Sequence, residues 1–182
     1  MKFQSLIKKI AETFDKNNIP YIIIGGQALL IHGEPRLTKD IDITLGITPE
    51  SLPRIIEILN DLSLKVLVDN PEKFVEETWV LPAICPVSKI RVDFIFSNSE
   101  FEKNVLKRAI NVKIENYPVK FTTVEDLIIY KIIAGRERDI EDVKNLIIKN
   151  SLDIEYIEKW LERFEIIFNK DFRKLFKVLL QS

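Results

Sequence analysis

Residues 38–45 have the sequence Thr-Lys-Asp-Ile-Asp-Ile-Thr-Leu, which predicts a β-strand. Because successive side chains of a strand point to opposite faces, Asp40 and Asp42 share one face and the two isoleucines share the other. Two neighbouring carboxylates repel each other and lose hydration when they are partly buried. A bound cation would remove both costs. The alternative is that both side chains of a half-exposed strand simply face solvent.

A third aspartate favours the cation over the solvated pair. Asp93 lies within the apolar segment 90–96, which predicts another strand. Aspartate is a poor strand residue, and carboxylates that converge from strands are typical ligands of one or two Mg²⁺ ions. We therefore predict a metal site made of Asp40, Asp42 and Asp93.

Two glycines stand at the end of an earlier strand. Gly25 and Gly26 follow the continuously apolar run 21–24, which predicts a buried strand, and precede a short helix over 27–32. Residues without Cβ atoms allow phosphate oxygens to approach backbone N–H groups at a helix N-terminus. The alternative is a tight turn that requires a positive φ. The aspartates that follow favour phosphate binding.

Length and composition narrow the class of protein. The chain has 182 residues, of which 46% are hydrophobic, and this predicts one domain or a core with a small appendage. A formal net charge of −1 supplies no overall positive field, so duplex DNA is not an expected partner. Cys85 is the only cysteine and His32 the only histidine, which excludes an internal disulfide and a Cys/His zinc cluster. Neither a signal peptide nor a run of about 18 apolar residues is seen, which favours a cytoplasmic protein without a membrane partner.

Hydrophobic periodicity predicts a mixed α/β (α+β) fold. A core over 1–122 combines strands and helices, and a helical region over 123–182 is expected to pack on it. Helices are expected over 3–14, 49–59, 98–106, 123–134, 140–147, 154–168 and 172–180, with further strands over 64–68, 78–81, 111–115 and 119–121. Two capping boxes are indicated at helix starts, Ser97 with Glu100 and Thr122 with Glu125. The rest of the proline-containing segment 69–88 indicates no element.

The glycines and the aspartates belong to a longer pattern. It reads Gly25-Gly26-Gln27-Ala28, then His32-Gly33-x-x-Arg36-x-Thr38-x-Asp40-Ile41-Asp42, and later Asp93. This pattern resembles the signature of the polymerase-β-like nucleotidyltransferase superfamily. It is most similar to the small prokaryotic branch of lincosamide and aminoglycoside nucleotidyltransferases and toxins of the AbiEii type. A later segment resembles the helical motif of the toxin-like members, Lys131-x-x-Ala134-x-Arg136-x-Arg138-Asp139-x-x-Asp142.

The resemblance, which covers residues 20–148, implies a fold and a reaction. The fold is a mixed β-sheet flanked by helices. In the reaction, an acceptor hydroxyl attacks the α-phosphorus of a nucleoside triphosphate such as ATP, and pyrophosphate leaves. Asp40 and Asp42 would hold Mg²⁺ against the phosphates, while Asp93 would share a second Mg²⁺ and help deprotonate the acceptor. Gly25 and Gly26 would bind the β- and γ-phosphates through their N–H groups.

Three basic residues are further candidates for contacts to the triphosphate. Arg36 and Lys39 lie in the loop before the aspartates, and Lys131 lies in the helical region. The alternatives are surface charges for the first two and a solvated helix lysine for the third. Because residues three and four apart meet on a helix, an ion-pair network that ties two helices together is expected for Arg138, Asp139 and Asp142.

The sequence does not identify the acceptor. A small molecule, a tRNA and a protein hydroxyl all fit the resemblance. Because no acceptor-binding domain is recognisable, the alternative is a module that binds nucleotide or a partner without turnover, such as a toxin–antitoxin component. The amphipathic helices expected over 154–168 and 172–180 could bury against the core, against a second copy of the chain in a homodimer, or against a partner subunit.

Overall fold

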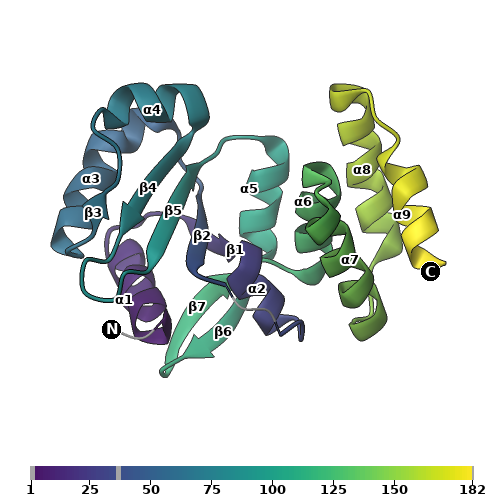
Figure 1. Cartoon of the computed structure of the whole chain (residues 1–182), viewed down its shortest axis with the longest axis horizontal. Helices are drawn as coiled ribbons and strands as arrows, with labels where there is room; N and C mark the ends of the chain where they lie inside the picture. The colour runs from purple at the N-terminus through teal and green to yellow at the C-terminus, as the bar shows by residue number, and fades with distance from the viewer. Residues whose placement is uncertain (1–2, 36–37, 182) are drawn as a thin grey trace. The chain divides into compact units, whose positions relative to one another are not determined.

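The computed structural model of the chain describes residues 3–35 and 38–181 (Figure 1). Within them, the strands form one mixed sheet in the order β3-β4-β5-β2-β1-β7-β6. The strands are β1 (Tyr21–Ile24), β2 (Asp40–Leu45), β3 (Lys65–Val66), β4 (Val80–Ile84), β5 (Arg91–Phe96), β6 (Ile110–Ile114) and β7 (Tyr117–Phe121). A mixed sheet combined with helices confirms the predicted fold class.

Helices occupy most of the remaining chain. They are α1 (Phe3–Lys16), α2 (Gly25–Ile31), α3 (Leu52–Asp61), α4 (Pro71–Thr78), α5 (Glu100–Arg108), α6 (Val124–Ala134), α7 (Glu137–Lys149), α8 (Ile154–Phe168) and α9 (Phe172–Leu180). A short 3₁₀ turn, η1 (Pro49–Ser51), precedes α3 where the sequence predicts one continuous helix. Among the described residues, no helix combines the length and the apolar character that a membrane span needs.

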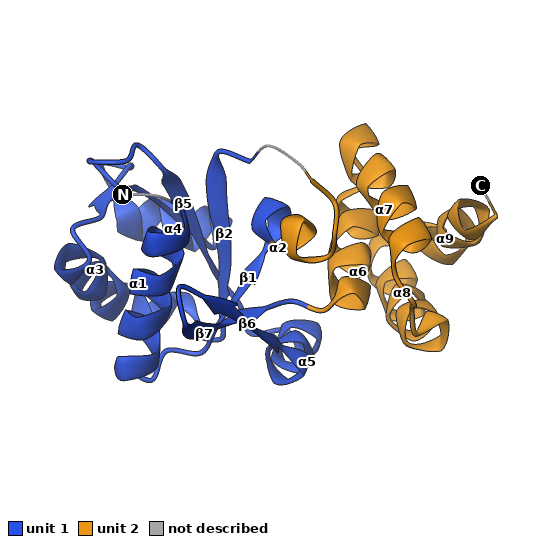
Figure 2. Cartoon of the chain, turned by 90° about the horizontal axis from the view of Figure 1, so that it is seen from below, with its two compact units in different colours: residues 1–27, 37–122 blue, residues 28–36, 123–182 orange. Residues whose placement is uncertain are grey.

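The chain divides into two compact units, which Figure 2 shows in different colours. The first unit comprises residues 1–27 and 37–122, and therefore contains the whole sheet. The second unit comprises residues 28–36 and 123–182. The boundary falls within α2, after Gln27, so the glycine pair belongs to the unit that carries the sheet.

In the first unit, the apolar core lies on one face of the sheet. Side chains of β2 and β5 alternate, and Ile41, Ile43, Val92 and Phe94 are buried on the same face. Phe14 of α1 packs on this face, because its ring centroid lies 5.7 Å from that of Phe94. Burial of these side chains stabilises the sheet and leaves the opposite face of β2 and β5 for polar residues.

In the second unit, α6 is the central helix. It packs against α7, α8 and α9, and its apolar residues are buried nearly all round. Trp160 of α8 and Phe176 of α9 are also buried, and Figure 1 shows these two helices side by side. Of the alternatives for the aromatic side chains of these two helices, burial within the second unit is therefore seen for Trp160 and Phe176.

The helix α4 lies in the segment for which the sequence indicates no helix. Its start is specified by Asn70, whose side chain accepts a hydrogen bond from the backbone N–H of Lys73, and by Pro71 at the first helical position. Pro71 thus begins a helix, although prolines in this segment suggest an irregular chain. Trp79 ends the helix with a φ of 59°, so the strand expected from residue 78 begins only at Val80.

The two predicted capping boxes are displaced along the chain. Ser99 and Glu102 form the box of α5, because Ser97 is buried and donates a hydrogen bond to the carbonyl of Leu45 at 2.7 Å. Similarly, Thr123 caps α6, since the N–H of the preceding residue pairs with a carbonyl of β1. In both cases the residue expected to cap the helix instead donates a hydrogen bond to a carbonyl of a neighbouring strand.

Candidate functional site

The three aspartates singled out by the sequence lie on neighbouring strands. β2 and β5 are parallel, and their register pairs Asp42 with Asp93 and Asp40 with Arg91. Residues that pair in register point to the same face of a sheet. All three carboxylates therefore leave the face opposite the apolar core, and Asp42 and Asp93 are direct neighbours across the strands.

Uncharged side chains flank this pair of carboxylates. Ile24 of β1 is the register partner of Asp42 on one side, and Pro82 of β4 is the partner of Asp93 on the other. Both aspartates are half-buried. Like charges directly opposite each other destabilise a sheet, so this arrangement needs a compensating positive charge.

Arg91 supplies that charge in this structure. Its Nε donates to both carboxylate oxygens of Asp93, at 2.8 and 3.1 Å. This hydrogen bond raises the pKa of Arg91, burial opposes the rise, and the charges of Asp93, Asp40 and Asp42 add to it. Arg91 is not among the site residues predicted above, although the two-residue alternation that identifies Asp93 also places Arg91 on its face.

Thr38 holds the first aspartate of the pair. Its Oγ1 lies 2.8 Å from Oδ1 of Asp40 and 3.1 Å from the backbone carbonyl of the same residue. A hydroxyl two residues before the carboxylate therefore restricts its rotamer. Thr38 is part of the sequence pattern quoted above, but the pattern alone does not indicate this contact.

The glycine pair packs directly against these side chains. A Cβ built on Gly25 would lie 2.0 Å from Oδ2 of Asp42, and one on Gly26 would lie 2.6 Å from Oγ1 of Thr38. Gly25 also has a φ of +63°, which a residue with a side chain rarely adopts. The sequence predicts that both glycines precede the helix, whereas they form the first residues of α2. The close approach that they permit is to Asp42 and Thr38.

The basic residues proposed as phosphate contacts differ in their exposure and in the unit to which they belong. Lys39 is exposed and precedes Asp40 in the first unit. Arg36 lies outside the described residues. Lys131 belongs to the second unit, where only 6% of its surface is exposed. The alternative that Lys131 is a solvated surface lysine is therefore wrong.

Lys131 takes part in a buried ion-pair network between α6 and α7. Its Nζ lies 3.2 Å from a carboxylate oxygen of Asp139 and 2.6 Å from one of Asp142. Arg136 also binds Asp139, whereas Arg138 is exposed and forms no ion pair within the described residues. The predicted network between helices is confirmed for Asp139 and Asp142 and is wrong for Arg138, because Lys131 and Arg136 are its cations.

The three strand aspartates fit a divalent cation in their chemistry. Carboxylate oxygens are the donors that Mg²⁺ prefers, and the bare backbone of Gly25 leaves space beside Asp42 that a Cβ would fill. Even so, residues 3–35 and 38–181 contain no group of three His, Cys, Asp or Glu side chains arranged to hold a metal ion. The contact between Arg91 and Asp93 turns one of the carboxylates toward an internal cation instead.

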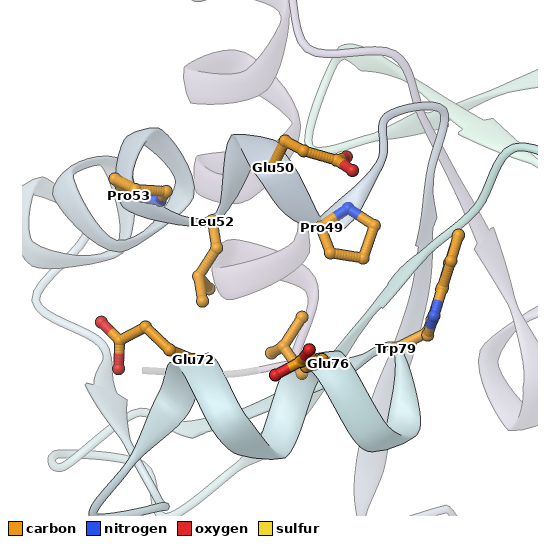
Figure 3. Close-up of a pocket in the computed structure, with 8 residues that line it drawn as sticks. Pro49, Glu50, Leu52, Pro53, Glu72, Glu76 and Trp79 are labelled. Atoms are coloured by element: carbon orange, nitrogen blue, oxygen red, sulfur yellow. The ribbon is translucent and has the colours of Figure 1, made fainter.

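A pocket of about 380 Å³ lies elsewhere in the first unit, between η1, α3 and α4 (Figure 3). Its floor includes the buried side chains of Leu52 and Val75, and Trp79, 42% exposed, forms part of its wall. None of the three strand aspartates lines it. The pocket is therefore separate from the carboxylates.

Comparison with known proteins finds a family model that matches most of the chain. A family model described as a nucleotidyltransferase of unknown function (DUF6036) matches residues 1–178. Among curated proteins no match is found.

Solved structures share the fold at low sequence identity. The solution structure of the antibiotic-resistance factor ANT(2'')-Ia is similar with a TM-score of 0.65 and 19% identity, over 91% of this chain and 92% of that one. The lincosamide antibiotic adenylyltransferase LnuA gives 0.55 and 16%, over 78% of this chain and 94% of its own. A putative nucleotidyltransferase from Thermotoga maritima gives 0.54 and 15%, over 81% and 94%. At these identities the matches show the fold alone.

Proposed function

Because the chain belongs to the DUF6036 family of nucleotidyltransferases within the polymerase-β-like superfamily, we propose that it transfers a nucleoside monophosphate from a nucleoside triphosphate to an acceptor hydroxyl. The observation that carries the proposal is the register of Asp42 with Asp93 beside Gly25. This register brings together two carboxylates that are 51 residues apart in the sequence, and Gly25 packs against the first of them.

The proposed step is an in-line displacement at the α-phosphorus. The acceptor oxygen forms a bond to phosphorus while the bond to the pyrophosphate oxygen breaks, and Asp93 accepts the proton of the acceptor hydroxyl. Asp40, Asp42 and Asp93 would hold Mg²⁺, which when bound neutralises charge on the phosphates. Positioning and neutralisation supply most of the catalysis in reactions of this kind.

The triphosphate is proposed to lie along the glycine pair. The N–H groups of Gly25 and Gly26 would bind phosphate oxygens, with Lys39 and Arg36 as further contacts from the loop before the aspartates. Lys131 is the remaining candidate. Its ammonium group is already bound by two carboxylates, so a phosphate there would have to replace one of them.

The test is transfer of label from each of four α-labelled nucleoside triphosphates in the presence of Mg²⁺ and cell extract. Wild-type protein is compared with Asp93→Asn and with Asp61→Asn, a control at the exposed end of α3. We expect the Asp93 variant to lose at least about a hundredfold in rate and the control to behave as wild type. Absence of transfer by the wild type with every nucleotide, or equal transfer by Asp93→Asn, would contradict the proposal.

One observation favours a second candidate, a nucleotide-binding module without turnover, such as a toxin–antitoxin component. The Nε–H group of Arg91 is shared between both oxygens of Asp93, so this carboxylate already has a cationic partner that competes with a metal ion. This candidate predicts that a nucleotide with Mg²⁺ raises the melting temperature while no product forms. A melting temperature that no nucleotide changes would argue against both candidates.

A further inference from the structure

Arg91 stands at the centre of the charge distribution on the polar face. It binds Asp93 through Nε, it is the register partner of Asp40, and the charge of Asp42 also acts on it. Its side chain is 52% exposed, whereas that of Asp93 is 17% exposed. The contact therefore joins a largely buried carboxylate to a cation that has a path to solvent.

On the strands nearest to the aspartates, Arg91 is the one cation of this face. The register places on the same face Ile22, Ile24, Asp40, Asp42, Thr44, Val80, Pro82, Ile84, Arg91, Asp93 and Ile95. Arg91 is the only cation among these residues of β1, β2, β4 and β5, and three of the others are aspartates. Lys65 of β3 shares this face through its register with Ile84, but β4 lies between its strand and β5.

We infer that Arg91 is an internal counter-ion that competes with the divalent cation for Asp93. The inference rests on the proposed function and concerns the regulation of the same site. A carboxylate oxygen that accepts a hydrogen bond from a guanidinium must release it before the same lone pair can bind a metal. Binding of the metal at those lone pairs is then an exchange in which the cation enters and the guanidinium leaves, and at the other lone pairs the two positive charges repel each other.

Because of the chemistry of arginine, Arg91 lowers the affinity of the site for a metal ion without preventing binding. The guanidinium keeps its charge at every physiological pH, so loss of a proton from Arg91 cannot release Asp93. The exposed part of the side chain allows Arg91 to turn toward solvent without disturbing the apolar core on the opposite face. The site therefore holds its carboxylates in place while it is empty, and binds a lone metal ion only weakly.

The exchange is tested by binding of Mn²⁺ alone, without nucleotide, measured by electron paramagnetic resonance. Arg91→Gln removes the competing cation, and we expect its affinity for Mn²⁺ to rise roughly tenfold. Lys113→Gln is the matched control, because it removes one positive charge from the exposed part of β6. In the sheet, β7, β1 and β2 separate β6 from β5, so we expect this control to bind Mn²⁺ as the wild type does.

Two further variants assign the effect to Asp93. Arg91→Lys keeps the charge and is expected to stay close to the wild-type affinity. Arg91→Gln combined with Asp93→Asn should lose the gain. An affinity of Arg91→Gln equal to or below that of the wild type overturns the inference, as does a failure of both proteins to bind Mn²⁺.

A measurement on the wild type keeps the inference testable if Arg91→Gln does not fold. The Nε–H group that donates to Asp93 gives a side-chain signal in ¹⁵N nuclear magnetic resonance. Addition of Mg²⁺ should shift this signal and speed its exchange with solvent. Bound metal together with an unchanged Nε–H signal would overturn the inference.

These readouts separate the inference from the proposed function. Neither Mn²⁺ binding nor the Nε–H signal requires an acceptor or turnover. If no transfer is found but Arg91→Gln binds Mn²⁺ more tightly, the proposed reaction fails and the counter-ion stands. If the wild type transfers nucleotide and Arg91→Gln has unchanged affinity, only the inference fails.

Discussion

Asp42 is a residue at which stability and the proposed activity oppose each other. Its register partner is Asp93, so two negative charges face each other between adjacent strands. In the Arg91→Gln protein, which lacks the compensating cation, we predict that Asp42→Asn stabilises the metal-free fold by about 0.5–1 kcal/mol, because it removes a like-charge pair from the sheet. Urea denaturation with EDTA present measures this change, and Asp61→Asn serves as the control. A free energy of unfolding lowered by the Asp42 substitution would show that this carboxylate is not repelled in the fold.

Position 25 requires glycine for two reasons, the conformation of its backbone and the lack of space for a side chain. Its φ is +63°, and an added Cβ would lie 2.0 Å from the Asp42 carboxylate. Gly135 has almost the same φ, +64°, but a Cβ there meets only backbone oxygens at 3.6 Å or more. We predict that alanine at either position costs about 1–2 kcal/mol of backbone strain.

Only Gly25→Ala should also displace Asp42. The expected consequence is weaker binding of Mn²⁺, measured with the Gly135→Ala protein as the reference for strain alone. Equal affinity for Mn²⁺ in the two variants would mean that the close approach of Gly25 to Asp42 has no role in the site.

At the scale of elements, the contact of α6 with α7 depends on the buried charges of Lys131, Asp139 and Asp142. Removal of one member of a buried ion pair leaves an uncompensated charge. We predict that Lys131→Met lowers the free energy of unfolding by about 3–5 kcal/mol. The control is Lys149→Met on α7, whose partner is Glu34 and whose side chain is 42% exposed. Loss of an exposed pair of this kind costs about 0–1 kcal/mol.

The comparison is made by urea denaturation at pH 7. A similar loss in the two variants would show that burial does not set the strength of the pairs at Lys131. Adding Asp142→Leu to Lys131→Met should recover part of the loss, because this second substitution removes one of the carboxylates left without a cation.

The same network predicts a pH dependence. Burial raises the pKa of Asp139, but the hydrogen bond from Arg136 and the charge of Lys131 outweigh it, so the pKa lies below the ordinary value. A carboxyl whose pKa is depressed by folding stabilises the protein when it is ionised. This contribution is complete at neutral pH and is lost as the pH falls from about 5 through the folded-state pKa.

The measurement is a series of urea denaturations between pH 7 and pH 3. We expect the free energy of unfolding to fall more steeply with acid in the wild type than in Asp139→Asn. Parallel curves for the two proteins would exclude Asp139 as a source of the acid sensitivity.

Elements were predictable from sequence where local signals agree. The bounds of α8 and α9 follow from the apolar pattern, from the capping contact of Asp153 and from Asn169, which ends α8 with a φ of 51°. The start of α4 carries comparable signals at Asn70 and Pro71, but a segment with several prolines obscures them. The helix caps differ from expectation because a strand competes for Ser97, and local pattern cannot reveal such a competition.

The sequence predicts which residues belong to the site but not how they are arranged. Alternation identifies which aspartates share a face of each strand, and it also places Arg91 on that face. The register of Asp42 with Asp93 depends on which strands are neighbours, and the spacing of 51 residues between them, from position 42 to position 93, does not determine that. The contact between Thr38 and Asp40 depends on a side-chain rotamer, which no periodicity encodes.

At the scale of the whole molecule, the division into two units predicts where a bound nucleotide changes the stability of the backbone. The glycine pair and all three strand aspartates belong to the first unit, whereas α8 and α9 belong to the second. A ligand that binds only the folded state slows the local opening of the residues that it contacts. With ATP and Mg²⁺ we therefore expect slower amide hydrogen exchange in β2, in β5 and in the first turn of α2.

Exchange in α8 and α9 should not change, and Asp93→Asn should show none of the protection. Slower exchange in α6 as well would support a phosphate contact at Lys131, because the amides of α6 report on the helix that carries it. Protection confined to the second unit would contradict the proposed site, since no residue of β2 or β5 would then contact the nucleotide.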